Sequence, residues 1–199
     1  MYRGEGGDAQ TMIGSMTLEK HRVRVSYEKE SEGELVADGN TVLSDTGEIF
    51  RDRENGYGYI DSPKTKAVYG FTGNKTIKLT NMEFSVKNDF ATVAISSLED
   101  EEIEKSGNLL LTAVGRADNT DAQYNEDHTV LEKDGHAPVL IDVIEAEIRM
   151  KTNKEKVLVW SVDSDGVLIG IIPSVIEEGW LKFTRGQEFE SMYYLIQEQ

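Results

Sequence analysis

The sequence predicts an all-β protein: a jelly-roll-like β-sandwich of antiparallel sheets with roughly a dozen strands. Apolar and polar residues alternate with a period of two in many segments from residue 21 onward, as they do along half-buried strands. Gly, Asn and Asp interrupt these segments about every eight to twelve residues, and no long amphipathic helical pattern stands between them. Such a series of short strands is typical of two sheets packed face to face. A closed barrel is the alternative.

The first 15 residues are rich in glycine. We interpret residues 1–15 as a linker or an expression-derived segment, and we expect residues 16–199 to form a single domain. The first predicted strand is "HRVRVSY", residues 21–27, in which Val23 and Val25 lie on one face.

A hairpin is predicted next. "GEIFRD" and "GYGYID" flank a turn at residues 53–56, where the pair Asn55 and Gly56 favours the positive φ angles of a type I′ turn. After the strand "KAVYGF", the apolar positions in residues 76–86 change face at Thr80 and Asn81, which indicates a bulge or two abutting strands.

The core is predicted around "FATVAISSL" and "NLLLTAVGRA", because their nearly continuous apolar residues are typical of central strands. Residues 115–137 are read as a long polar loop. The remaining predicted strands are "PVLIDVIEAEIRM", "KVLVWSVD", "GVLIGII", "WLKFT" and "SMYYLIQ", with a hairpin turn at residues 163–166.

Composition excludes several classes of partner. The formal charge is -16 at pH 7, so the protein repels nucleic acids and anionic membranes, and neither is expected to bind. The chain has no cysteine, which excludes disulfides and Cys-ligated metal sites. No apolar stretch is long enough to span a bilayer. We expect a monomer.

No catalytic residue is predicted. The G-x-S-x-G turn of Ser-His-Asp hydrolases does not occur, and the histidines, His21, His128 and His136, do not have the spacing of zinc ligands. A glycosidase requires two carboxylates, one of them with a raised pKa. No carboxylate stands in the apolar context at a strand end that would raise its pKa.

Calcium is a candidate ligand of the polar loop, because the loop carries several carboxylates. The candidate ligands are Asp118, Asp121, Glu126 and Asp127. The alternative is a solvated acidic loop, since the spacing does not match the EF-hand pattern. No cofactor is expected to be required.

Carbohydrate binding would use exposed aromatic rings together with planar polar side chains. Tyr57 and Tyr59 share one strand face, about 7 Å apart, and would stack on successive sugars. Tyr124 and Trp180 are further candidates. The alternative is that the tyrosines pack beneath a neighbouring sheet.

Three segments resemble a known family when taken together in order: "LSDTGEIFRDRENGYGYIDSPKTKAVYGFTG", "FATVAISSLEDEEIEKSGNLLLTAVGRADNT" and "GHAPVLIDVIEAEI". They are similar to the C-terminal accessory β-sandwich of secreted bacterial glycoside hydrolases of the cellulase and hemicellulase type. The likeness covers roughly residues 40–197. It implies an extracellular module whose partner is a polysaccharide or the catalytic domain of the same parent chain.

Lys64 and Lys66 stand where the family has Arg and Gln in "P-R-T-Q". The resemblance implies that this polar strand faces glycan or the catalytic domain, so both lysines are candidate carbohydrate-binding residues. The alternative is that Pro63 and the two lysines blunt a sheet edge.

The preferred functional hypothesis is a non-catalytic module that binds glycan or braces a catalytic domain. One alternative is a small β-sandwich glycoside hydrolase or lyase that acts on plant polysaccharide. Another is a cell-surface module that binds protein through an exposed apolar patch.

Overall fold

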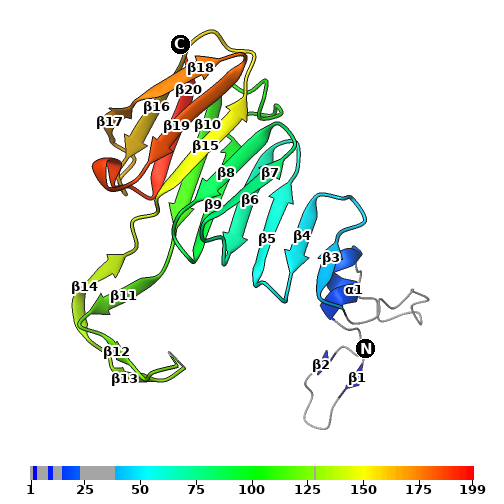
Figure 1. Cartoon of the computed structure of the whole chain (residues 1–199), viewed down its shortest axis with the longest axis vertical. Coiled ribbons are helices and arrows are strands. Elements are labelled where there is room, and N and C mark those ends of the chain that lie inside the picture. Colours follow the sequence, from blue (N-terminus) through cyan, green and yellow to red (C-terminus); the bar gives the residue numbers. More distant parts are fainter. Residues whose placement is uncertain (1, 4–8, 11–14, 23–38, 128) are drawn as a thin grey trace.

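The computed structural model describes residues 2–3, 9–10, 15–22, 39–127 and 129–199. The predicted all-β class is confirmed: an antiparallel sheet of nine strands, the large sheet, packs against an antiparallel sheet of five strands, the small sheet. The strand predicted at residues 21–27 lies mostly outside the described residues. Figure 1 shows the small sheet covering only one part of the large sheet.

In pairing order, the strands of the large sheet are β17 (Leu168–Ile172), β16 (Val157–Val162), β20 (Tyr193–Glu198), β10 (Asn108–Val114), β9 (Ala91–Ser97), β6 (Thr65–Gly70), β5 (Tyr57–Asp61), β4 (Ile49–Asp52) and β3 (Thr41–Leu43). Those of the small sheet are β18 (Ser174–Glu177), β19 (Trp180–Arg185), β15 (Ala146–Lys151), β8 (Met82–Val86) and β7 (Lys75–Leu79).

The remaining elements are short. They are the ribbons β1 (Tyr2–Arg3) with β2 (Ala9–Gln10), β11 (Ala117–Thr120) with β14 (His136–Ile141), and β12 (Gln123–Tyr124) with β13 (Leu131–Lys133), the helix α1 (Ser15–Lys20) and the 3-10 helix η1 (Gln187–Phe189). The nine-stranded and five-stranded sheets already exceed the predicted dozen strands, and the ribbons add six more among the described residues.

The core lies between the two sheets, where alternate residues of each strand point inward. Phe84 and Ile148 of the small sheet and Val93, Ile95 and Leu111 of the large sheet are fully buried. Removing each such side chain from water contributes about 1.5–3 kcal/mol to folding. The predicted central strands, β9 and β10, do lie at the centre of the large sheet, although their burial alternates along the strand.

One buried side chain, Arg185, makes polar contacts that join the two sheets inside this core. Arg185 of β19 is 1% exposed, and its Nε donates a hydrogen bond of 3.0 Å to the hydroxyl of Tyr194 in β20. Its Nη2 donates to the carbonyl of Ser191 over 3.0 Å, and the guanidinium lies over the Tyr194 ring. Burial lowers the pKa of Arg185 and raises the pKa of Tyr194.

The large sheet extends past the small sheet at strands β5, β4 and β3 (Figure 1). On the inner face, Val68, Tyr59, Phe50 and Leu43 are neighbours in register across β6, β5, β4 and β3. This row begins in the core and ends at Leu43, which is 47% exposed. The helix α1, which the sequence did not predict, contacts β3 and buries Met16.

The prediction of a polar loop at residues 115–137 is wrong. The described residues within 115–141 include two antiparallel ribbons, β11 with β14 and β12 with β13, which project from the sandwich as an arm (Figure 1). The strand predicted at residues 138–150 is accordingly divided between the arm and β15. We call residues 117–141 the arm.

One turn also differs from expectation. In the β4–β5 hairpin only Gly56 has a positive φ, of 66°, so the turn is not type I′. Instead the Asp52 carboxylate accepts hydrogen bonds from the backbone and side-chain amides of Asn55. The alternative of two abutting strands at Thr80 and Asn81 is confirmed: the two residues form the tight turn between β7 and β8, with Asn81 at a φ of 58°.

Replacing Tyr194 with Phe is expected to lower the free energy of unfolding by about 1–3 kcal/mol, because the buried Arg185 Nε loses its acceptor. Urea denaturation followed by tryptophan fluorescence measures the change. The control is Tyr193→Phe, at a half-buried position, which should change stability by less than about 0.5 kcal/mol. Equal effects of the two substitutions would contradict a structural role for the Arg185–Tyr194 contact.

Candidate functional site

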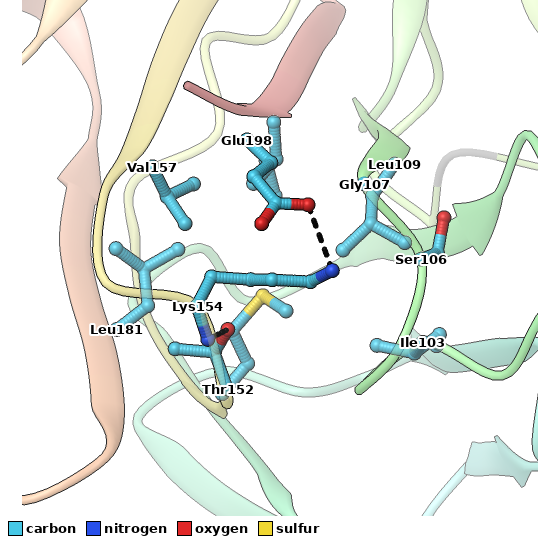
Figure 2. A pocket seen from close by; sticks show the side chains of 11 residues that line it. Ile103, Ser106, Gly107, Leu109, Thr152, Lys154, Val157, Leu181 and Glu198 are labelled. Carbon is cyan, nitrogen blue, oxygen red and sulfur yellow. Dashed lines mark hydrogen bonds and ion pairs between the residues drawn. The ribbon is translucent and has the colours of Figure 1, made fainter.

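Three hollows among the described residues differ in their lining, and the smallest of the three is no ligand site. It lies between the sheet ends, where Figure 2 shows Lys154 reaching across to Glu198, a contact of 2.8 Å. The enclosed volume is about 10 Å³, and the walls are mainly apolar side chains such as Leu109 and Leu181. This is room for one water at most. A second hollow of about 410 Å³ is open and runs along β18 and β19.

The largest of these three hollows is a cleft of about 540 Å³ between α1 and the strands β4, β5 and β6. We call it the α1 cleft. Ser15 and Glu19 line it from the helix, Arg51 from β4 and Tyr69 from β6. Arg53 and Gly56 of the β4–β5 turn and Tyr57, the first residue of β5, complete the lining. Because Arg51 pairs with Gly58, which pairs with Tyr69, Arg51 and Tyr69 lie on the outer face of the large sheet.

The predicted tyrosine pair lies on the other face of the same strands. Tyr57 and Tyr59 share the inner face of β5, as predicted, and Phe50 of β4 lies between them. The Phe50 ring stacks on Tyr59 with 4.9 Å between centroids and is tilted against Tyr57 at 6.1 Å. Tyr59 also packs against the core, and the Lys75 ammonium lies 4.3 Å from the Tyr57 ring centroid. Part of each tyrosine ring is therefore already in contact with protein.

The two candidate lysines have different environments. Lys66 is 6% exposed and forms an ion pair with Asp61, whose other carboxylate oxygen accepts hydrogen bonds from the backbone and hydroxyl of Thr80. This contact fastens the tip of the β7–β8 hairpin to the large sheet. Lys64 is half exposed and pairs with the exposed Asp100.

The remaining aromatic candidates do not join this surface. Tyr124 lies in the arm, where its hydroxyl donates to Asp118 over 2.6 Å. Trp180 begins β19 on the outer face of the small sheet, with the Arg149 guanidinium 5.3 Å from its ring centroid. The predicted carbohydrate-binding residues therefore lie on three separate surfaces.

The predicted calcium ligands all belong to the arm. Asp118 accepts a hydrogen bond from Tyr124, and Asp121 pairs with His136 at 3.1 Å, while Glu126 and Asp127 follow β12. Within the described residues, no group of three or more His, Asp or Glu side chains is arranged to hold a metal ion. Calcium binding by these four carboxylates therefore stays a prediction.

Five carboxylates have pKa values below their usual range: Asp52, Asp61, Glu99, Asp100 and Glu102. For Glu99 the cause is hydrogen bonding from the Asn108 side chain and the Gly107 amide. For Asp61 burial acts to raise the pKa, but the hydrogen bonds from Lys66 and Thr80 outweigh it. A glycosidase acid requires the opposite shift, so none of these five is suited to that role.

The arm presents apolar side chains without a covering layer among the described residues. Val139 and Leu140 of β14 are 58% and 56% exposed, and Ile141, Val130 and Leu131 are also exposed. Consecutive strand residues point to opposite faces, so both faces of the β11–β14 ribbon carry exposed apolar side chains. An isolated two-stranded ribbon is marginally stable in water. The arm is therefore a candidate interaction surface.

Comparison with known proteins found no family model, no curated protein and no solved structure that matches this chain. Within the described ranges, no helix is long and apolar enough to cross a membrane.

Sequence reasoning missed Phe50, Glu19 and the arm strands. Phe50 could have been found, because the predicted hairpin places it across from Tyr59. Glu19 lies 32 positions before Arg51, the residue it pairs with, and no local pattern signals that contact. In the arm, Asp118 and Asn119 of β11 pair with Leu140 and Val139 of β14, so the alternation of a core strand was not present.

Replacing Lys66 with Met should lower the free energy of unfolding by about 1–3 kcal/mol, because Asp61 keeps its charge but loses its cationic partner. Lys64→Met is the matched control and should cost less than about 1 kcal/mol, since its ion pair is exposed. Chemical denaturation of both variants measures the difference. If Lys64→Met were as harmful as Lys66→Met, the role of Lys66 as an internal fastener would be excluded.

Proposed function

We propose that this chain is a non-catalytic accessory module of a polysaccharide-degrading glycoside hydrolase that braces the catalytic domain. The observation that carries this proposal is the projecting arm with its exposed apolar side chains. The resemblance of residues 40–197 to accessory modules of secreted glycoside hydrolases supplies the class of partner. An extracellular location is part of the same proposal.

The chemistry of the arm favours another folded domain as its partner. Val139, Leu140 and Ile141 form one continuous exposed apolar stretch on β14. A neutral polysaccharide offers hydroxyl groups and narrow C–H surfaces, whereas a folded domain offers an apolar groove that removes such aliphatic side chains from water.

The charge of the arm further narrows the kinds of protein surface that could bind it. Residues 117–141 contain six Asp and Glu residues and one Lys. A second copy of this chain is a poor partner, because the whole chain carries a charge of -16 and like charges repel. A groove with an apolar floor and a basic rim would match both features of the arm.

One prediction of this proposal concerns binding of the arm to the catalytic domain. With the parent catalytic domain produced separately, Leu140→Ser should weaken its complex with this chain about tenfold, because a buried leucine contributes about 1.5–3 kcal/mol. Calorimetric titration measures the dissociation constant. Hydrogen exchange should show protection of the arm amides in the complex.

Leu98→Ser is the matched control for that experiment. Leu98 has the same side chain and is 55% exposed, compared with 56% for Leu140, but it follows β9 on the sandwich. Its substitution should leave the affinity within about twofold, as expected for a residue outside the interface. Unchanged affinity with Leu140→Ser, or equal losses with both variants, would contradict docking through the arm.

Another prediction of this proposal concerns hydrolytic activity of the isolated chain. The purified chain should release no reducing sugar from a panel of soluble and insoluble plant polysaccharides. Hydrolysis that a single Asp→Asn or Glu→Gln substitution abolishes would instead identify a small glycoside hydrolase, and the accessory-module proposal would then be wrong.

A further inference from the structure

The α1 cleft has the size and the polar lining of a small-molecule site, whereas the arm is a projecting ribbon with exposed apolar side chains. Its volume of about 540 Å³ falls within the range of small-molecule sites, about 300–1,000 Å³. Arg51 and Tyr69 line it from the outer face of the large sheet, and Tyr57 lines it from the start of β5. The cleft shares no lining residue with the arm.

An aromatic ring forms part of the cleft wall. A side chain at position 58 would lie only 2.4 Å from the Tyr69 hydroxyl and 2.5 Å from its Cζ atom. Because Gly58 has no side chain, the phenol of Tyr69 lies across β5, and its hydroxyl donates a 3.2 Å hydrogen bond to the Phe50 carbonyl. The ring is thus supported by the sheet on one side, while Tyr69 also lines the cleft.

Charged side chains surround this ring. Glu19 accepts hydrogen bonds from Arg51 Nη1 at 2.9 Å and from Arg53 Nη2 at 2.8 Å, both through its Oε1 atom. Arg53 Nη2 also donates to the Ser15 hydroxyl over 2.6 Å. Because one carboxylate holds both guanidinium groups, the side chains are oriented before any ligand arrives, which reduces the entropy lost on binding.

The balance of these groups selects the class of ligand. Two guanidinium groups and one carboxylate leave a single net positive charge, and the carboxylate would repel a phosphate or sulfate. An apolar ligand would leave the charged groups without water, which is costly. A sugar hydroxyl both donates and accepts hydrogen bonds, and the C–H face of a sugar ring matches an aromatic surface. The groups in the cleft therefore fit a neutral sugar better than an anion or a lipid.

We propose that the α1 cleft binds a neutral sugar unit, with Tyr69 as the stacking platform and with Glu19, Arg51 and Arg53 as the hydroxyl-binding groups. The site would let the module hold glycan with its outer sheet face while the arm engages a protein domain. The two interactions use different residues and do not depend on each other.

The test is a titration of the whole chain with glucose, xylose, mannose, galactose and arabinose and with their β-1,4-linked disaccharides. Amide chemical shifts in NMR spectra report binding. At least one sugar should shift the amides of Arg51, Arg53 and Tyr69 in a saturable manner. Tyr69→Ala should weaken that binding about tenfold, the value of one aromatic contact.

Two control variants sharpen the result. Tyr69→Phe keeps the ring face and should retain affinity within about threefold, because only the hydroxyl is lost. Trp180→Ala removes a ring from the outer face of the small sheet, outside the cleft, and should also retain affinity within about threefold. If circular dichroism shows that Tyr69→Ala does not fold, Glu19→Gln and Arg51→Gln take its place and should each weaken binding by a similar factor.

Three outcomes would overturn the inference: no sugar of the panel binds, binding is lost with Trp180→Ala and kept with Tyr69→Ala, or inorganic phosphate binds where no sugar does. These failures are distinguishable from failure of the accessory-module proposal. Leu140→Ser affects only the interaction with the catalytic domain, and Tyr69→Ala affects only sugar binding.

Discussion

The packing of two sheets of unequal width is the constraint on which the rest of the structure depends. The small sheet covers the inner face of the large sheet over the strands whose alternate residues are fully buried. Beyond the edge strand β7, the large sheet continues through β5, β4 and β3 without a second layer of strands (Figure 1). This leaves the row of Tyr59, Phe50 and Leu43 at the margin of the core. On the opposite face, α1 covers β3 and forms the wall of the cleft.

The two proposed interactions follow from this geometry. Strands that no second sheet covers need other groups to shield their apolar side chains. On β5, β4 and β3 an aromatic row lies on one face, and the short helix α1 covers part of the other face. The helix supplies the acidic partner for two arginines that would otherwise stand side by side. The arm, which leaves the sandwich between β10 and β15, has no such cover among the described residues. An outside domain is the natural cover for it.

The sequence predicted the sandwich well because its determinants are local. Period-two alternation in β8, β9 and β10 follows directly from the pleat of a half-buried strand, and Gly166 marks the β16–β17 turn with a positive φ. The candidate site was predicted less well because its determinants are contacts between distant segments. From the sequence alone, Lys66 is interpreted as a polar edge residue, because its contacts with Asp61 and Thr80 appear only in the folded structure. Tyr69 is likewise interpreted as an ordinary aromatic residue of a strand, because only the pairing of β5 with β6 places it over Gly58.

The base of the arm has a mechanical consequence. The arm begins after β10 and ends before β15, strands of different sheets. It is closed at its root by Asp142, whose backbone amide donates to the Arg116 carbonyl and whose carboxylate accepts from the Arg116 amide. A load applied at the tip of the arm therefore reaches both layers of the sandwich at once. It acts as shear along the core rather than as a pull on one edge strand, and a face-to-face core resists shear through all of its interlocked side chains together.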